Sequence, residues 1–491
     1  MSVLKKVASG VGWGSLSIII ITLFQLFFMG VMARLLDPVD FGLIAIANVS
    51  LRFYSYFSQV GIAPALIQKK TLQDGDINAA LSLSLSISSI FCVLAFLAAP
   101  LTETFFGLKG LAPVMQVLAL NFIIFGFSSI SQALLRRKSK FKALSIIEII
   151  SYVLGYGTTG LIAAYMGAGV WALVIAFMTQ SLLSSLLSYL VIRYPIRFKH
   201  SRTQRRSLIS YGGRYSIIGF IEFLTANIVP LLIGKLLGAA PAGFYNRAFL
   251  IAHLPVQQPA NVLTKTLFPI MSKMNDQKEK QLISLQLSSL LVGCYAFAVS
   301  MGLYNAADNI IIVLLGNKWI ASIPMLKILS LSIAPLYIAH TVGGTLDTMA
   351  ELRLKLRIQI AVFLWLVLPL IWVVPSLDIE KIAIVVVISA YIRLFLMYGA
   401  AFHLLNISAK EMTLMILTFI SVAAITALFS YGIPRLFTLT DIPILSLFID
   451  VAAGAVGLVI SLLFSRYFLR KLHSIIYLKK QLPLFNKIME M

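Results

Sequence analysis

The sequence predicts an all-α polytopic membrane protein with about fourteen transmembrane helices, and three observations indicate this class. Of the 491 residues, 59% are hydrophobic and only 12% are charged, whereas soluble domains carry about 25% charged residues. The apolar residues fall into runs of about 20, the length that a helix needs to cross a bilayer. Short segments of alternating hydrophobicity, which are typical of membrane β-barrels, are absent from the sequence, so we expect helical spans.

Short loops join the expected spans. The longest loops lie near 193–207, 305–319 and 432–444, and none is long enough to fold as a soluble catalytic domain. The first apolar run is too long for a cleavable signal, so we expect it to remain as a span. The spans are expected at residues 11–34, 41–66, 78–100, 112–135, 143–165, 169–192, 208–234, 243–271, 283–304, 320–346, 356–375, 381–404, 411–431 and 445–467.

Basic residues determine the expected orientation. The chain has 40 Lys and Arg against 18 Asp and Glu, a formal net charge of +22. Most of the basic residues fall in alternate loops, such as 136–142 and 193–206, and in the C-terminal tail. Because basic loops stay on the cytoplasmic side, we predict that both termini are cytoplasmic. The charge is thus explained by membrane topology, and we expect no binding of nucleic acid.

Matching segments occur in the two halves of the chain. A loop and the start of a helix recur six spans later, and since six is even, both halves insert in the same orientation. The matching segments are 34–38 with 235–239, Phe41-Gly42 with Gly243-Phe244, 105–107 with 314–316, and 113–120 with 324–331. We therefore expect two parallel six-helix lobes around a central cavity. The expected parts are an N-lobe at 1–200 (spans 1–6), a C-lobe at 201–405 (spans 7–12), appended spans 13 and 14 at 406–468 and a basic cytoplasmic tail at 469–491.

These segments resemble those of a transporter family. Further matching motifs are Gly61–Lys70 after span 2, Gly243–Ala248 and Pro255 near the start of span 8, and Leu267–Pro269 at its end. Together they resemble the Wzx-type polysaccharide flippases of the multidrug, oligosaccharidyl-lipid and polysaccharide exporter superfamily, most closely the colanic-acid-exporter branch. The resemblance covers the whole chain in length and span order. It implies a bacterial inner-membrane protein that moves undecaprenyl-diphosphate-linked oligosaccharide repeat units from the cytoplasmic to the periplasmic leaflet, for surface polysaccharides such as lipopolysaccharide or exopolysaccharide.

The resemblance also implies the partners. They are the lipid-linked oligosaccharide, the membrane lipids and, as a further candidate, polysaccharide polymerase machinery. We expect no cofactor, and coupling to H⁺ or Na⁺ stays unassigned. The two cysteines, Cys92 and Cys294, lie in apolar runs, so we expect neither a disulfide framework nor a metal site.

Five cations inside the expected spans are the candidate substrate-binding residues. A charge at the centre of a span costs at least about 2.5–3.5 kcal/mol on insertion scales, so it needs a partner or a function. Arg52 and Arg393 lie near the middle of spans 2 and 12, too deep to reach an interface easily. Arg214, Arg247 and Lys327 lie nearer to the ends of spans 7, 8 and 10, where a long side chain can extend to the interface. A positive interior suits a diphosphate, which Arg can bind bidentately.

Acidic residues supply the competing interpretation. Glu222 in span 7 and Glu148 in span 5 could form structural ion pairs with Arg52 or Arg393. Glu222 could instead serve as a proton or sodium coupling site. Asp347 at the end of span 10 and Asp450 in span 14 are two further acidic residues considered with them.

Other functions agree less well with the sequence. An ATP-driven transporter needs a G-x-x-x-x-G-K-[ST] loop, which is absent from the sequence. A polysaccharide polymerase or ligase is expected to carry a large periplasmic loop with catalytic residues, whereas the outward loops here are short. An ion-coupled drug antiporter of the same superfamily has a compatible architecture, but twelve spans and interior carboxylates are usual there. A scaffold would leave the buried charges unexplained. We therefore expect a transporter and not an enzyme.

Overall fold

The computed structural model describes residues 3–58, 62–69, 72–196, 216–272, 278–349, 351–373, 378–436 and 442–469. Within these ranges every regular element is a helix, and each of the fourteen expected spans corresponds to a helix or to a run of consecutive helices. Among the described residues, twelve helical segments, two of which join consecutive helices, are long and apolar enough to cross a membrane. The all-α polytopic class is thus confirmed, and the chain is a multi-pass membrane protein.

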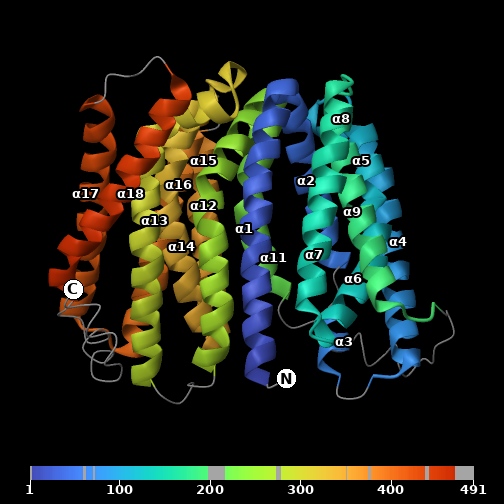
Figure 1. Ribbon diagram of the computed structural model, residues 1–491, viewed down its shortest axis with the longest axis horizontal. Helices are drawn as coiled ribbons and strands as arrows, with labels where there is room; N and C mark the ends of the chain where they lie inside the picture. The colour runs from blue at the N-terminus through green and yellow to red at the C-terminus, as the bar shows by residue number, and fades with distance from the viewer. Residues whose placement is uncertain are drawn as a thin grey trace. The chain divides into compact units, whose positions relative to one another are not determined.

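The helices form two compact units, residues 1–246 and 247–491, and within each unit they run side by side (Figure 1). The division falls inside α12, so α11 belongs with the first unit. The lobe boundaries expected from the repeat stay a prediction, because two compact units can form with or without a duplicated sequence.

The first unit begins at the N-terminus and ends within α12. Its helices are α1 (Val3–Leu35), α2 (Pro38–Ser58), α3 (Ile62–Gln68), α4 (Asp74–Phe106), α5 (Leu111–Ala119), α6 (Asn121–Arg137), α7 (Phe141–Ile150), the π-helix η1 (Ser151–Thr158), α8 (Thr159–Tyr165), α9 (Val170–Ile192), α11 (Ser216–Leu236) and the start of α12 (Ala239–Ser272).

The second unit contains the remainder of α12 and the later helices. They are α13 (Lys278–Leu314), the 3₁₀-helix η2 (Asn317–Trp319), α14 (Ser322–Thr348), α15 (Leu352–Val373), α16 (Ile379–Leu405), α17 (Ala409–Leu436) and α18 (Pro443–Leu469). Helix α13 continues through Leu314, so the long loop expected at 305–319 is wrong for its first ten residues.

Helices α2 and α12 are the two long helices whose described residues contain no strongly apolar stretch. Helix α2 contains Asp40 and Arg52, and α12 contains Arg247 and His253. They correspond to spans 2 and 8, which are six apart and so equivalent in the predicted repeat. Polar residues in membrane helices usually face a protein interior or a water-filled cavity, because lipid cannot solvate them. The composition of these two helices is therefore the feature expected of helices that line a transport pathway.

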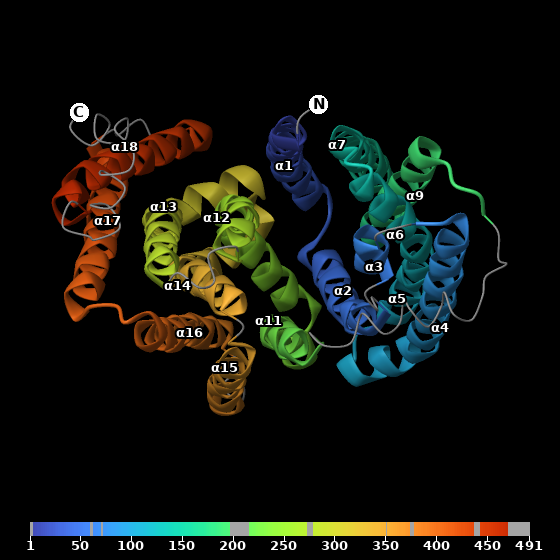
Figure 2. The same ribbon diagram turned by 90° about the horizontal axis from the view of Figure 1, so that it is seen from below.

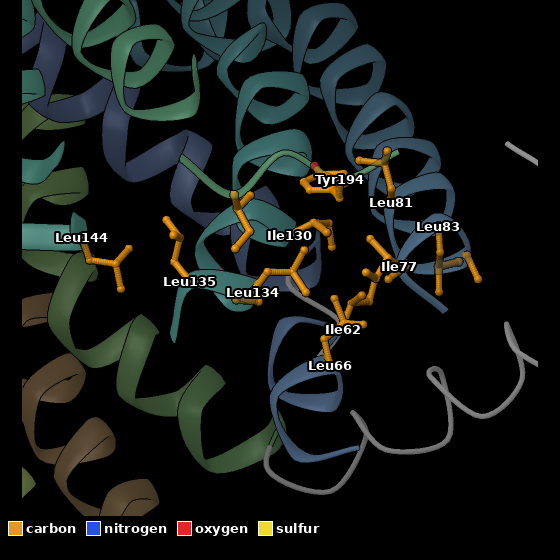
Figure 3. Close-up of a cluster of buried hydrophobic side chains, with 14 of the residues drawn as sticks. Ile62, Leu66, Ile77, Leu81, Leu83, Ile130, Leu134, Leu135, Leu144 and Tyr194 are labelled. Atoms are coloured by element: carbon orange, nitrogen blue, oxygen red, sulfur yellow. The ribbon is translucent and has the colours of Figure 1, made fainter. Parts of the chain in front are cut away.

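The first unit has an apolar core at the α3 end. It joins Ile62 and Leu66 of α3 to Ile77 and Leu81 of α4, with further side chains from α6, α7 and α9 (Figure 3). Tyr194, which follows α9, completes this core. In a bilayer such contacts stabilise mainly through close packing, because lipid is as apolar as the core.

The repeated segments 38–42 and 239–243 contact each other reciprocally. A Cβ added at Gly42 would lie 1.7 Å from the carbonyl oxygen of Ala239, and one added at Gly243 would lie 2.1 Å from that of Pro38. In the repeat, Pro38 is equivalent to Ala239 and Gly42 to Gly243. Reciprocal contacts of this kind are the mark of a two-fold relation. Only glycine allows the two backbones to approach so closely.

We expect Gly42→Ala to lower the melting temperature of the purified protein in detergent. The added methyl group has to displace the backbone of Ala239, and overpacking of this kind costs about 1–3 kcal/mol. The control is Gly12→Ala in α1, where a Cβ meets no atom within 4 Å and where alanine favours the helix by up to about 1 kcal/mol. If both variants melt like the wild type, the close contact of the two segments is wrong.

Candidate functional site

Arg52 is an exposed cation on α2. The preceding residue, Leu51, is buried, whereas the Arg52 side chain is exposed. Within the described ranges Arg52 forms no hydrogen bond and no ion pair with the protein. A guanidinium carries five N–H donors in a rigid fork. As far as the described residues go, all five donors of Arg52 are available to a ligand.

The two acidic residues that were expected to pair with the cations, Glu222 and Glu148, lie on different helices. Glu222 lies half-buried on α11, which packs against α2 through Phe53, Phe220 and Phe223. Because Arg52 has no ion-pair partner among the described residues, the expected pairing of Arg52 with Glu222 is not formed in this structure. Glu148 is exposed on α7. The coupling role of Glu222 stays a prediction.

Arg247 and Arg393 belong to the second unit. Arg247 lies on α12 and is only 8% exposed. Its position near the end of a span would allow the side chain to reach the membrane interface, but in this structure it is buried. Arg393 lies half-buried on α16. Burial of guanidinium groups in a membrane helix bundle is costly, and Arg247 is the one predicted cation in the described residues that is fully buried.

Lys327 on α14 forms an ion pair that the sequence analysis missed. Its Nζ lies 2.7 Å from Oδ2 of Asp308 on α13. Asp308 falls in the segment 305–319 that was expected as a loop, so its pairing with Lys327 is not indicated by the sequence. Both side chains are partly exposed, and such pairs typically contribute about 0–1 kcal/mol. A role for Lys327 in substrate binding requires this pair to open.

The five predicted cations are therefore distributed over the chain. Arg52 belongs to the first unit, whereas Arg247, Lys327 and Arg393 belong to the second. Arg214 lies in 197–215, outside the described residues. That these residues form one substrate site stays a prediction.

A polar contact between α13 and α18 is a second feature that the sequence analysis missed. Asn309 donates from Nδ2 to Oδ2 of Asp450 at 2.8 Å, and Asp450 is only 6% exposed. One turn earlier, Asn305 donates to Ser430 Oγ of α17 at 2.7 Å. The asparagines lie four residues apart, so they share one face of α13. This four-residue spacing is the feature of the sequence that could have indicated a polar helix face. These bonds join the two appended helices to the rest of the second unit.

No group of three or more His, Cys, Asp or Glu suited to a metal ion occurs among the described residues. Asp347, the acidic residue at the end of α14, binds Lys355 with 2.8 Å between Oδ2 and Nζ. It therefore serves in a local ion pair.

A pocket of about 460 Å³ lies between α2, α4 and α11 in the first unit. Phe53 and Tyr54 of α2, Phe105 and Phe106 of α4, and Phe223 of α11 give it an aromatic lining. Its polar groups are few. Sequence reasoning did not identify it, because three helices far apart in the chain contribute to it.

We expect the single charge reversals Lys327→Asp and Asp308→Lys each to lower the melting temperature of the purified protein, because each places like charges at an ion-pair distance. The double variant with exchanged charges should recover most of the loss, as an interacting pair does in a double-mutant cycle. Lys109→Asp, which alters an exposed lysine, controls for net charge. Equal effects of the single and double variants would contradict the pair.

The known proteins that this chain resembles in sequence are named for polysaccharide biosynthesis or transport. The family model described as "Polysaccharide biosynthesis protein" matches residues 31–324. The chain is similar to the lipopolysaccharide biosynthesis protein WzxC of Escherichia coli K12, with 27% identity over 369 residues, 74% of each chain. It is also similar to the succinoglycan biosynthesis transport protein ExoT of Rhizobium meliloti, with 27% identity over 331 residues, 67% of this chain and 66% of the relative.

Solved structures show the same fold. The lipid II flippase MurJ in an inward closed conformation covers 93% of this chain and 99% of its own, with a TM-score of 0.69 and 13% identity. An inward-facing multidrug transporter of the MATE family covers 79% of this chain and 94% of its own, with a TM-score of 0.62 and 14% identity. Because the family model spans more than half of the sequence, this chain belongs to the polysaccharide biosynthesis protein family.

Proposed function

We propose that this protein is a flippase that moves lipid-linked oligosaccharide units from the cytoplasmic to the periplasmic leaflet of the bacterial inner membrane. The observation that carries the proposal is membership of a polysaccharide biosynthesis family by a multi-pass membrane protein. Relatives named for lipopolysaccharide biosynthesis and succinoglycan transport support it. The fold, shared with a lipid II flippase over 93% of the chain, is compatible with it.

The cations supply the chemistry for the proposed substrate. An undecaprenyl diphosphate head group carries two negative charges, and guanidinium groups bind such oxygens bidentately. Arg52 has no partner among the described residues, and in the second unit Arg247 is buried and Arg393 half-buried. With Arg214, these residues form the proposed cationic site. Lys327 joins it only in a state in which its pair with Asp308 is open.

Alternating access is the proposed mechanism. The polar helices α2 and α12 are the proposed moving elements, and the reciprocal contact of Gly42 and Gly243 joins their N-terminal ends in this structure. Breaking that contact would open the pathway at this end. We propose that both termini lie in the cytoplasm and that Glu222 is the candidate for coupling to H⁺ or Na⁺.

Drug export is the second candidate, because the multidrug transporter fold also matches. That match leaves about a fifth of the chain uncovered, whereas the lipid flippase covers nearly all of it. The relatives named for polysaccharide production favour the flippase.

Deletion of the gene tests the proposal. We expect surface polysaccharide to be lost and lipid-linked repeat units to accumulate facing the cytoplasm. Single repeat units that reach the surface without polymerisation would indicate a polymerase instead. Normal polysaccharide together with increased drug sensitivity would indicate a drug exporter.

Arg52→Ala is expected to abolish export while the protein remains inserted at normal abundance, because no group in the described part of the chain pairs with Arg52. Arg52→Lys should restore export only in part, since an ammonium group cannot form the bidentate contact. Export and abundance are measured in the deletion strain. Arg353→Ala, which removes an exposed arginine at the start of α15, is the matched control. Normal export in Arg52→Ala would remove this residue from the site.

The orientation can be checked with single cysteines. A cysteine at Lys138 is expected to be shielded from an impermeant thiol reagent in intact cells, whereas one at Lys318 is expected to be labelled, because basic loops stay in the cytoplasm. The native Cys92 and Cys294 are buried, so their background labelling should be low. The reverse pattern would invert the proposed topology.

A further inference from the structure

A dense group of cations lies at the turn between α6 and α7. The seven residues 136–142 contain five lysines and arginines and no acidic residue. Arg137 is half-buried and donates from Nη1 to the carbonyl oxygens of Leu66 and Ile67 in the last turn of α3. The other four cations are exposed, and they are Arg136, Lys138, Lys140 and Lys142. One short stretch of backbone thus presents four cations outward.

These four cations have no acidic partner in the part of the chain that the structure describes. Other lysines, such as Lys69 and Lys355, bind carboxylates at 2.6 and 2.8 Å. None of the four forms a hydrogen bond or an ion pair with a described residue through its side chain. Lys142 instead lies over the ring of Trp13 on α1, with its Nζ 4.9 Å from the ring centre. An anion from outside the protein can therefore bind these cations without displacing a carboxylate.

The backbone of this turn is fixed by its own hydrogen bonds. The N–H groups of Lys138, Ser139 and Lys140 each donate to a carbonyl oxygen in the last turn of α6, at 2.9 Å. Ser139 has a φ of 53°, the left-handed conformation in which many helices end. A ligand that binds at this turn then has to order only side chains and not the loop, which lowers the entropic cost of binding.

The cations adjoin the lipid-facing side of α7. Lys142, Ile146 and Ile150 follow one another at four-residue intervals and are all exposed, so they share one face of the helix. They belong to the span Phe141–Tyr165, which is apolar enough to cross a membrane. Figure 2 shows α7 at the edge of the first unit, beside α1 and α9, with which it packs. Isoleucines exposed on such a span face lipid.

This arrangement indicates the kind of partner. A soluble acidic protein suits a polar surface, whereas the surface beside these cations continues directly into an apolar, lipid-facing stripe. A phospholipid has both parts, because its acyl chains suit the isoleucines and its phosphate lies at the membrane surface, where aromatic rings such as that of Trp13 are typical. An anionic head group suits the cations better than a zwitterionic one, whose ammonium group the lysines repel.

We propose that the α6–α7 turn and the adjoining face of α7 bind an anionic phospholipid, with its phosphate against the lysines of the turn and an acyl chain along Ile146 and Ile150. A lipid held in this way fixes the depth of α6 and α7 in the bilayer. The site does not depend on the flippase function proposed above. It adds a lipid of the membrane itself as a ligand of the first unit.

Quenching of Trp13 fluorescence tests the site. The purified protein is placed in phosphatidylcholine nanodiscs that contain a minor fraction of phosphatidylglycerol brominated on its acyl chains, since bromine quenches a tryptophan that it contacts. The chain has five tryptophans, so the contribution of Trp13 is the difference between the wild type and Trp13→Phe. We expect this contribution to be about tenfold larger with brominated phosphatidylglycerol than with the same fraction of brominated phosphatidylcholine.

The double variant Lys138→Gln, Lys140→Gln removes two of the charges and leaves the cation over Trp13 in place. We expect its quenching by brominated phosphatidylglycerol to fall to the level of phosphatidylcholine. The matched control is the double variant Lys278→Gln, Lys280→Gln, which removes two exposed lysines at the start of α13 and changes the net charge equally. This control should be quenched like the wild type, and the melting temperatures of both variants check that they fold.

Equal quenching of Trp13 by the two brominated lipids in the wild type would overturn the proposal. Wild-type quenching in the Lys138→Gln, Lys140→Gln variant would do the same. Loss of the preference in an excess of inorganic phosphate would show a site for a free anion, and its loss in an excess of polyglutamate would show a site for an acidic polypeptide. Each of these results rejects the phospholipid site, whereas the gene deletion described above tests the flippase function separately.

Discussion

The cost of placing charge in hydrocarbon governs the arrangement of this protein. A bilayer offers no hydrogen bonds, so the backbone must form helices and each polar side chain needs a partner, a cavity or a ligand. The structure shows protein partners for several of these side chains. Asp308 balances Lys327, Asn309 binds Asp450, and Arg52 remains available on one of the two most polar long helices. The apolar helices are those long and apolar enough to cross a membrane, whereas α2 and α12 contain the candidate residues Arg52 and Arg247.

Much of the fold could be predicted because membrane insertion is a local property of the sequence. The length of each apolar run and the side on which basic residues gather define a span without knowledge of its neighbours. The segment 305–314 was harder to predict. It contains Asn305, Asp308 and Asn309 and resembles a loop, yet it is helical because its polar groups are bound by Ser430, Lys327 and Asp450. These partners lie on other helices, so the hydropathy of the segment itself does not reveal them.

The candidate site was predictable only as a set of residue types. The position of Arg52 in a span indicated a function, but its lack of a partner depends on how α11 packs on α2. The pocket was not predictable, because it arises where a proline bend in α4 meets two helices that are distant in sequence. Lys327 shows the opposite case. The sequence places it as a cation inside a span, but its pairing with Asp308 depends on how α13 packs against α14.

The polarity of α2 and α12 also bears on how the protein is made. When each helix enters the lipid according to its own hydrophobicity, these two helices insert poorly, since an arginine within a span opposes insertion. Helix α2 therefore needs its neighbours to be present before it leaves the insertion machinery, and so does α12. Biogenesis of this chain then cannot proceed one helix at a time. The same polar side chains that suit a transport pathway make assembly of the bundle a cooperative step.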